Sequence, residues 1–327
     1  MPITRRTLLT SIAAAPIASA LPRAAFAAYP EHPVRLIVPF AAGGNADFVA
    51  RVVSEGMSKL IGQQIVVEYR AGAGGSLGAT EVAKAAPNGY TLLTGSNGPL
   101  TVNPFVQAKL GYDSLKDFTA VGLANLVAHS LVVPGSSPVK SLAELIALSK
   151  TKTVTIGTSG AGSATHLTLA RFNAQMGTNF VHVPYRGGGA MMPDLLGGNI
   201  SGAMTEFSIV LAQHKAGKVR VIAIASAKRS PLAPDVPTMI EGGAKDFTAA
   251  SYVGIVAPAK TPPEIVATLE KALIATVSSK ATQDKFLAVG AELVPDALMT
   301  SKGFAAYIKQ EYEHSREAAK LAGLTPK

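Results

Sequence analysis

The fold is decided by the stretch Val34-Arg-Leu-Ile-Val-Pro39-Phe40-Ala-Ala-Gly43-Gly44-Asn45-Ala-Asp47. Its first five residues form an apolar run rich in β-branched side chains, which predicts a strand that ends at Pro39. A strand, a glycine loop and a helix N-terminus in this order surround a small hollow with unpaired backbone N–H groups. We therefore expect the loop to hold an anion through its backbone. The helix is predicted from apolar residues at steps of three and four, namely Val49, Val52, Val53, Met57 and Leu60.

The N-terminus has the features of an export signal. The pair Arg5-Arg6 precedes an apolar stretch over about 8–21, and the small-residue pattern Ala25-Phe26-Ala27 follows it. We expect cleavage near Ala27 and export by the twin-arginine route, with an ordinary Sec signal as the alternative. Pro16 and Pro22 interrupt the stretch, which falls short of the roughly 20 apolar residues of a membrane span, so we expect no stable membrane insertion.

Composition and charge narrow the class of protein. The chain has 327 residues, no cysteine and a formal net charge of +9, which falls to +6 without residues 1–27, because these hold three arginines and no acid. The basic residues are scattered, whereas a nucleic-acid-binding surface needs a clustered patch, so we expect no nucleic acid partner. A mildly positive protein attracts small anions. The lack of cysteine excludes disulfides and lipid attachment at a lipobox cysteine, and the length predicts two domains.

Strands and helices alternate along almost the whole sequence, which predicts an α/β fold with mostly parallel sheets flanked by helices. Ser141-Leu-Ala-Glu144 and Thr261-Pro-Pro-Glu264 have the capping-box pattern of helix starts. Further strands are predicted at about 64–68, 90–94, 131–133, 154–157, 180–183 and 219–225, and helices at about 77–85, 264–277 and 303–321. Glycine-rich loops follow strands at 40–45, 95–98, 157–163 and 185–189, and two sheets facing across a cleft would use all four.

The usual signatures of catalysis are missing. Gly157-Thr-Ser159-Gly160-Ala161 does not complete a nucleophile elbow, and the glycine segments at 72–77 and 160–165 miss the dinucleotide fingerprint. There is no Walker loop, and the six histidines are isolated, with no pair at metal-ligand spacing. We therefore expect no catalytic residue, no cofactor and no metal.

Polar residues follow several predicted strands in patterns that suit a bound carboxylate. The segment Ser159-Gly-Ala-Gly-Ser163-Ala-Thr165-His166 brings hydroxyl and backbone N–H groups to a helix start, although helix capping by Ser159 or Ser163 explains part of this pattern. Arg186, which follows Tyr185, can pair with an anion or lie in solvent. Asp47 is expected to favour its own helix start. Glu206 is either an exposed acid at a helix start or a carboxylate that faces the cleft.

Seven motifs, taken in order along the chain, resemble one family. They are Tyr29-Pro-x-x-Pro-Val-Arg-Leu-Ile-Val-Pro-Phe-Ala-Ala-Gly-Gly44, Arg70-Ala-Gly-Ala-Gly-Gly-Ser-Leu-Gly-Ala79, Ala86-Pro-Asn-Gly-Tyr-Thr-Leu-Leu93, His182-Val-Pro-Tyr-Arg-Gly187, Asp194-Leu-Leu-Gly-Gly198, Ser230-Pro-x-x-Pro-Asp-Val-Pro-Thr238 and Ala257-Pro-Ala-Lys-Thr-Pro262. With them the chain resembles the Bug-type solute receptors of the tripartite tricarboxylate transporters. The resemblance covers essentially everything after the export signal.

The resemblance implies a two-domain periplasmic binding protein of type II, which closes on its ligand like a Venus flytrap. Carried over, one domain comprises residues 28–129 and 250–327, and the other comprises residues 130–249. The implied ligand is a small carboxylate, either an organic acid or an acidic amino acid, and the implied partners are integral membrane permease subunits. We expect a periplasmic monomer. The implied ligand-binding positions are Phe40, Ala41, Gly43, Gly44, Asn45, Ser96, Asn97, Ser159, Ser163, Thr165, His166 and Tyr185.

The chain departs from the family pattern at two places that can face the cleft. Glu206-Phe207 stands where many relatives have an Asp-Asn pair, and Tyr252 stands where tryptophan is common. We include Glu206 among the candidate ligand-binding residues. As a charged carboxylate it would repel a second ligand carboxylate and suit an ammonium or hydroxyl group, which favours an amino-acid ligand.

The sequence therefore predicts a solute-binding protein that captures a small carboxylate in a cleft and delivers it to a permease. Its mechanism would be hinge closure around the ligand, without chemistry. The alternatives are a hydrolase-like enzyme on a similar two-lobed scaffold, and a receptor that reports ligand occupancy to a signalling partner.

Overall fold

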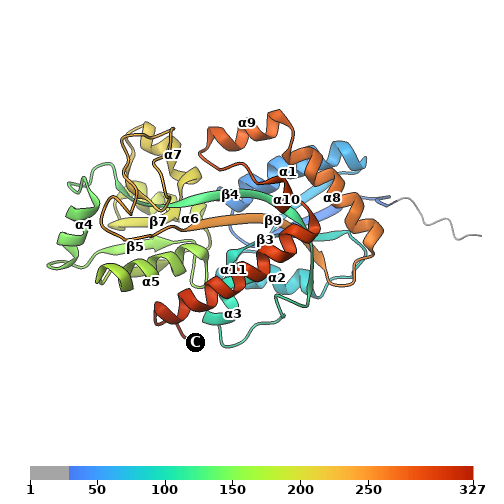
Figure 1. Cartoon of the computed structure of the whole chain (residues 1–327), viewed down its shortest axis with the longest axis horizontal. Helices are drawn as coiled ribbons and strands as arrows, with labels where there is room; N and C mark the ends of the chain where they lie inside the picture. Colours follow the sequence, from blue (N-terminus) through green and yellow to red (C-terminus); the bar gives the residue numbers. More distant parts are fainter. Residues whose placement is uncertain (1–28, 327) are drawn as a thin grey trace, which may run out of the picture.

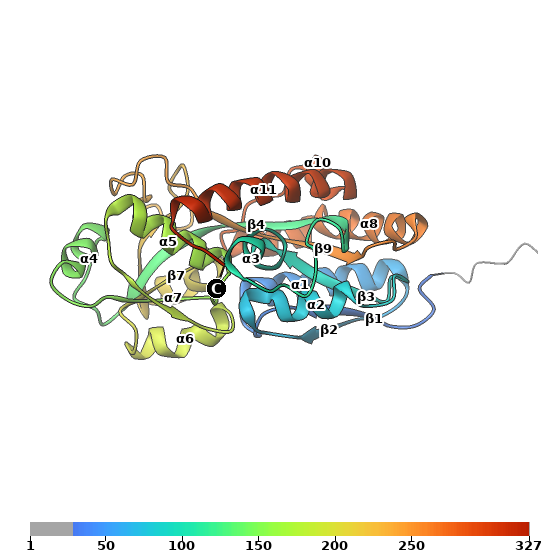
Figure 2. The same ribbon diagram turned by 90° about the horizontal axis from the view of Figure 1, so that it is seen from below.

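The computed structural model describes residues 29–326, and the predicted export signal lies outside these residues. Two groups of strands, each with its own helices, are joined by two strands that run between them (Figure 1). We call the group around β1–β3 the first lobe and the group around β5–β8 the second lobe. Figure 2 shows the two lobes side by side, with helix α11 along one side of the molecule.

The strands are β1 (Val34–Val38), β2 (Ile65–Tyr69), β3 (Thr91–Ser96), β4 (Phe118–Pro134), β5 (Thr155–Thr158), β6 (Val181–Pro184), β7 (Gly202–Glu206), β8 (Val219–Ile224) and β9 (Ala250–Pro258). The helices of the first half are α1 (Asn45–Ile61), η1 (Ala73–Gly75), α2 (Ser76–Ala83), η2 (Gly98–Val102), α3 (Asn103–Val106), α4 (Leu142–Ser149) and α5 (Ala164–Met176). Those of the second half are α6 (Gly188–Gly197), α7 (Phe207–Lys215), α8 (Pro263–Val277), α9 (Lys280–Ala288), α10 (Asp296–Met299) and α11 (Ser301–Leu321).

The strands follow the order β2-β1-β3-β9-β4-β7-β5-β6, with β8 also paired to β4. Pairing is parallel within each lobe, at β1–β2, β1–β3, β5–β6 and β5–β7, as the alternating sequence pattern predicts. It is antiparallel wherever β4 or β9 takes part. The sequence analysis found only the far end of β4, because this strand is buried along almost its whole length and has no alternating pattern to reveal it.

The two crossing strands form the connection between the lobes. β4 pairs with β9 from Phe118 to Ala128 and then with β7 and β8 from His129 to Pro134. Its register with β9 shifts twice, near Ala120 and Leu123, and such irregularities bend and twist a strand. Helix α11 packs against β4 of the connection, η2 of the first lobe and α5 of the second lobe.

Local sequence signals explain most helix ends. Helix α1 ends at Gly62 in the left-handed conformation, and Ser141 Oγ accepts a hydrogen bond from Glu144 N at the start of α4, as its capping box predicts. The second capping-box prediction is wrong. Helix α8 has no side-chain cap, because its N-cap residue is Pro262 and Thr261 lies one residue before it. The Thr261 hydroxyl donates to the Pro258 carbonyl.

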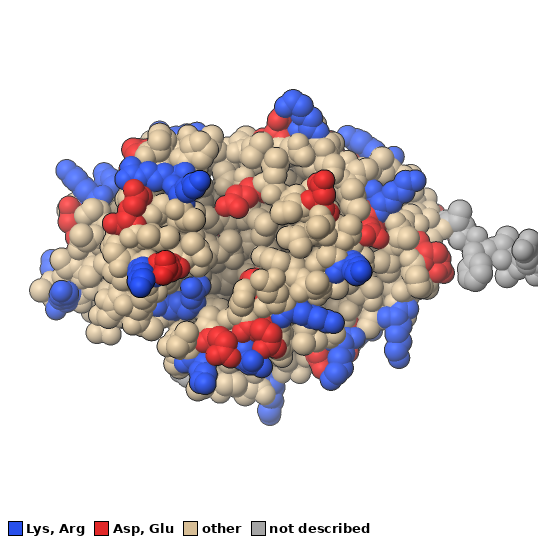
Figure 3. Space-filling view, viewed as in Figure 1, with Lys and Arg blue, Asp and Glu red and all other residues tan. Residues whose placement is uncertain are grey.

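Charged side chains of both signs are interspersed on the face shown in Figure 3, and a hollow lies between the two lobes. Within residues 29–326, no helix combines the length and apolar character that crossing a membrane requires.

Candidate functional site

A small cavity of about 30 Å³ lies between the two lobes. A buried water needs roughly 10–15 Å³ of such space, so the cavity accepts only a small chemical group. Its walls come from the carboxyl end of β3, the N-termini of α1 and α5, the end of β7 and the start of β9. The lining residues are Phe40, Gly44, Asn45, Ala46, Ser96, Asn97, Gly98, Ser159, Ser163, Ala164, Gly188, Glu206, Ser251, Tyr252 and Val253. We call this space the inner cavity.

The glycine loop before α1 supplies one wall. Gly43 has a φ of 83°, a left-handed value that glycine adopts without strain, and its N–H donates to Asp47 Oδ2 at 2.8 Å. Asp47 also accepts from Arg51 and from the Tyr69 hydroxyl, so it braces the loop, as expected of an acid at a helix start. Helix α1 has no side-chain cap, so its first N–H groups, at Asn45 and Ala46, remain available at the cavity.

The loop before α5 supplies the opposite wall, and its polar residues hold one another. Ser159 N donates to Thr165 Oγ1 at 2.9 Å, and Ser163 Oγ accepts from His166 N as the helix cap. The expected capping role of Ser163 is thus confirmed. Thr165 is fully buried beneath the loop, so it positions Ser159 and does not reach the cavity.

Two hydroxyl groups at the cavity have no hydrogen-bond partner among the described residues. They are Ser96 Oγ, at the end of β3 in the first lobe, and Ser159 Oγ, after β5 in the second lobe. Each residue is 6% exposed. A buried hydroxyl without a partner costs free energy, so each of these groups retains hydrogen-bonding capacity that the described residues do not use.

Asn97 lines the cavity but uses its side chain elsewhere. Its Oδ1 accepts from Tyr252 N at 2.9 Å and its Nδ2 donates to the Ala250 carbonyl at 3.3 Å. These bonds fix the start of β9, one of the two connecting strands. Asn97 therefore positions the wall of the cavity.

The two lobes touch through one backbone hydrogen bond and one hydrogen bond between side chains. Ala41 N donates to the Arg186 carbonyl at 2.8 Å, and Ser208 Oγ donates to Asn45 Oδ1 at 3.2 Å. A Cβ atom on Gly189 would lie 2.1 Å from the Ala42 carbonyl oxygen, closer than any side chain permits. The glycines of segment 187–189 thus allow the lobes to meet.

A second chamber of about 220 Å³ adjoins the inner cavity. Both spaces are lined by Phe40 and Ser159, and the outer one is also lined by Gly72–Gly74, Tyr185 and Arg186. The Tyr185 hydroxyl donates to Asp194 Oδ2 at 2.6 Å, which fixes its ring against the chamber. A ligand longer than a single carboxylate has room to extend here.

Glu206 is buried at the inner cavity, which excludes the alternative of an exposed acid. Its Oε1 lies 3.1 Å from Ser251 Oγ, and its Oε2 accepts from the Thr205 hydroxyl at 3.3 Å. Removal from water raises the pKa of the Glu206 carboxyl group above its usual range.

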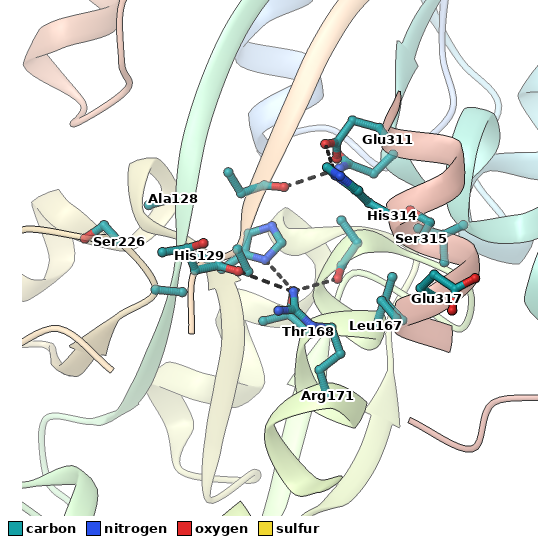
Figure 4. Close-up of a pocket in the computed structure, with 18 of the residues that line it drawn as sticks. Ala128, His129, Leu167, Thr168, Arg171, Ser226, Glu311, His314, Ser315 and Glu317 are labelled. Atoms are coloured by element: carbon teal, nitrogen blue, oxygen red, sulfur yellow. Dashed lines mark hydrogen bonds and ion pairs between the residues drawn. The ribbon is translucent and has the colours of Figure 1, made fainter. Parts of the chain in front are cut away.

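Behind Glu206 lies a fully buried histidine at the connection of the lobes. His129 Nε2 lies 2.8 Å from Ser251 Oγ, and His129 Nδ1 lies 2.8 Å from Thr168 Oγ1. Burial, reinforced by the charge of Arg171, lowers the pKa of His129 to about 3. Figure 4 shows His129 and Thr168 together at a groove of about 670 Å³ between α5, α11 and the connecting strands. Asn97 lines both this groove and the inner cavity.

Eight of the predicted binding residues line the inner cavity and five do not. Phe40, Gly44, Asn45, Ser96, Asn97, Ser159, Ser163 and Glu206 line it, whereas Ala41, Gly43, Thr165, His166 and Tyr185 lie outside its lining. His166 accepts from Gly162 N and stacks on His182 at 4.1 Å, beside a different hollow. Seven lining residues were not among the predicted binding residues, namely Ala46, Gly98, Ala164, Gly188, Ser251, Tyr252 and Val253. Gly188 belongs to a glycine run already noted, but Ser251 sits in an apolar strand with no local signal.

The cavity presents the Ser159 hydroxyl without a described hydrogen-bond partner. The Ser159 hydroxyl, the candidate nucleophile of a hydrolase, contacts no base that would remove its proton. In the part of the chain from residue 29 to 326, no three histidine, cysteine, aspartate or glutamate side chains gather as metal ligands do.

Comparison with known proteins points to the same class. The family model described as tripartite tricarboxylate transporter family receptor matches residues 49–324. Protein BugT of Bordetella pertussis is 36% identical over 281 residues, which cover 85% of this chain and 86% of BugT.

Solved structures have the same fold. The periplasmic binding protein BugD superposes with a TM-score of 0.88 at 34% identity, over 91% of this chain and all of BugD. Rpa4515 of R. palustris with adipate gives a TM-score of 0.87 at 32% identity, over 91% and 100% of the two chains. MatC of Rhodopseudomonas palustris with bound malate superposes with a TM-score of 0.85 at 30% identity, over 89% of this chain and 99% of MatC. The predicted fold class, a two-domain periplasmic binding protein, is thereby confirmed, and these neighbours are binding proteins and not enzymes. The chain belongs to the receptor family of the tripartite tricarboxylate transporters.

Proposed function

We propose that this protein captures a small carboxylate between its two lobes and delivers it to a membrane permease. The observation that carries the proposal is the pair of unpartnered hydroxyl groups, Ser96 Oγ and Ser159 Oγ, which face one cavity from opposite lobes. The family membership and the adipate and malate in two similar structures support an organic acid as the ligand.

In this proposal one ligand carboxylate enters the inner cavity. It accepts hydrogen bonds from both serine hydroxyls and from the N–H groups of Asn45 and Ala46, where the dipole of α1 adds positive potential. Phe40 covers the carboxylate, and the rest of the ligand extends into the outer chamber beside Tyr185 and Arg186. Thr165 and Asn97 act indirectly, because they hold Ser159 and the start of β9 in place.

Closure would then be driven by a ligand that contacts both lobes at once. We propose residues 28–129 and 250–327 as one domain and residues 130–249 as the other, with the hinge where β4 and β9 pair. Export to the periplasm, cleavage near Ala27, action as a monomer and transfer to permease subunits are parts of the same proposal, supported by the family and by the N-terminal sequence.

The test compares four serine-to-alanine variants, each of which removes a buried hydroxyl group without a partner. Ser96→Ala and Ser159→Ala change the cavity, while Ser54→Ala and Ser114→Ala are matched controls, since neither lines it. The native protein is first screened by thermal shift with mono-, di- and tricarboxylates, where a ligand at 100 times its Kd stabilises by about 2.7 kcal/mol.

With the carboxylate that gives the largest shift, the two cavity variants should bind at least about tenfold more weakly, because hydrogen bonds to a charged group contribute about 1.5–3 kcal/mol each. The two controls should bind as the native protein does. If no carboxylate shifts the native protein while sugars or cations do, the proposed function is wrong. If carboxylates bind but all four variants behave alike, the site assignment is wrong.

A further inference from the structure

An unbroken chain of buried hydrogen bonds leads from helix α5 to the acid at the inner cavity. Thr168 Oγ1 lies 3.0 Å from the Ala164 carbonyl and 2.8 Å from His129 Nδ1. His129 Nε2 lies 2.8 Å from Ser251 Oγ, which lies 3.1 Å from Glu206 Oε1. The chain thus has four links and joins α5, β4, β9 and β7. Apart from the helix carbonyl, every member is buried.

If every link in this series of hydrogen bonds is made, the series needs one proton more than its groups ordinarily carry. Each link requires one hydrogen atom, so the four links require four. Thr168 and Ser251 carry one hydroxyl proton each, and a neutral imidazole carries one. The carbonyl at one end and an ionised carboxylate at the other carry none. With neutral His129 and ionised Glu206, three protons would serve four links.

With all four links made at once, the fourth proton resides on Glu206 or on His129, and the surroundings favour Glu206. His129 is 1% exposed and no acid other than Glu206 is in its hydrogen-bond chain, so a charged imidazolium would be buried without solvent. Burial lowers the pKa of His129 to about 3 and raises the pKa of Glu206. With the proton on Glu206, the Glu206 carboxyl group donates to Ser251 Oγ, and the Ser251 hydroxyl donates to His129 Nε2. His129 then carries its own proton on Nδ1 and donates it to Thr168 Oγ1, whose hydroxyl donates to the Ala164 carbonyl.

Charged neighbours do not change this assignment. The positive charge of Arg171 on α5 further disfavours an imidazolium at His129. The other titratable groups at the groove are Glu292, Tyr307, Glu311, His314 and Glu317, none of which is bonded to His129 (Figure 4). Tyr252 of β9 also lines the inner cavity, but its hydroxyl donates to Thr101 Oγ1, and burial keeps the phenol neutral by raising its pKa far above the usual value. The walls from α1 and α5 present only uncharged side chains there.

We propose that Glu206 carries a proton when the lobes are together, so that the cavity presents a neutral acid and selects a carboxylate ligand without an ammonium group. This replaces the hypothesis, drawn from the sequence alone, that a charged Glu206 favours an amino acid. A neutral acid does not repel a ligand carboxylate, and it offers no negative partner to an ammonium group. The ligand preference rests on the proposed function, whereas the proton itself does not.

Spectroscopy of the protein without added ligand tests the proton directly. At pH 7 the infrared spectrum should contain the C=O stretch of one buried protonated carboxyl group, which disappears in Glu206→Gln and persists in Glu311→Gln, a control at the groove. If Glu206→Gln removes carboxylate bands instead, the proposal is wrong. Nitrogen-15 NMR of the native protein reports which nitrogens of His129 carry a proton, and it needs no variant to fold. A proton on His129 Nδ1 alone supports the proposal, and an imidazolium or a proton on Nε2 alone overturns it.

Calorimetry with succinate and aspartate, which differ by one ammonium group, tests the ligand preference. Native protein at pH 7 should bind succinate at least about tenfold more tightly, and tighter binding of aspartate overturns the inference. If neither compound nor any other carboxylate binds, the proposed function fails while the infrared result stands. At the alkaline pH where the infrared band is lost, Kd for succinate should rise by up to about tenfold per pH unit, as one linked proton requires. Glu206→Gln should abolish that rise, and an unchanged native Kd as the band disappears contradicts the linkage.

Discussion

The backbone N–H of Ala41 donates a hydrogen bond to the carbonyl of Arg186 at 2.8 Å, across the cleft between the lobes. Two glycine-rich loops that are far apart in the sequence meet at this bond. The contact needs no particular side chain, but it requires that nothing larger than hydrogen project between the loops. The proposed closure therefore depends on the glycines of segment 187–189.

Gly189→Ala should block closure without harming either lobe. The new Cβ would meet the Ala42 carbonyl of the other lobe at 2.1 Å, while alanine in helix α6 is locally favourable. We expect carboxylate affinity to fall at least about tenfold, or 1.4 kcal/mol. Calorimetry gives the affinity, and small-angle X-ray scattering with ligand reports the closed shape.

Gly197→Ala, at the other end of the same helix, is the control for this prediction. Its Cβ would meet only the Asn199 side chain, at the ordinary distance of 3.6 Å. This variant should bind as the native protein does. Full ligand-induced compaction of Gly189→Ala would refute the role assigned to the loop contact.

Thr165→Val should weaken both folding and binding, although Thr165 does not line the cavity. The change keeps the shape but leaves Ser159 N–H without its acceptor, and an unsatisfied buried donor costs about 1–3 kcal/mol. Urea unfolding measures the stability and calorimetry measures the affinity. Thr151→Val, at an exposed helix end, is the control. Equal stability of Thr165→Val and the native protein would argue against the positioning role.

Stability should fall as the pH drops from about 6.5 to 4. Burial, with a contribution from the charge of His166, lowers the pKa of His182 to about 4, whereas its pKa in the unfolded chain is about 6.5. Below pH 6.5 the unfolded chain therefore takes up a proton that the folded protein refuses, which favours unfolding. Allowing for the partial exposure of His182, we expect it to contribute a loss of about 1–2 kcal/mol.

His182→Gln should reduce this acid sensitivity. Urea unfolding at pH 7 and at pH 4.5 gives the difference for each protein. His314→Gln is the control, because the His314 side chain is exposed on α11. A native protein as stable at pH 4.5 as at pH 7 would contradict the sign of this prediction.

Export can be tested at the pair Arg5-Arg6, which lies outside the described residues. If the twin-arginine route is used, replacing both residues by lysine should leave folded precursor in the cytoplasm. Cell fractionation measures this. Unchanged export would assign the signal to the Sec route.

The sequence alone determined the local units and the class of protein. The run Val34–Val38, the glycines after it and the periodic apolar residues of α1 fix a strand, a loop and a helix, because each depends on neighbours within a few residues. The ordered motifs along the chain predicted the family, which the comparisons confirm. Capping by Ser163 and bracing by Asp47 could also be predicted, since each side-chain acceptor lies within about one helical turn of the backbone N–H that donates to it.

Only the tertiary structure decided which polar groups remain without partners. Ser159 and Thr165 are both hydroxyl residues of one loop, and the sequence does not distinguish their roles. In the structure the Thr165 hydroxyl accepts from Ser159 N–H, whereas Ser159 lines the cavity and its Oγ has no partner among the described residues. Ser251 has no local signal, because its role comes from His129 and Glu206 on two other strands. Whether a buried group is charged, satisfied or available depends on residues that folding brings from distant parts of the chain, and no local pattern records them.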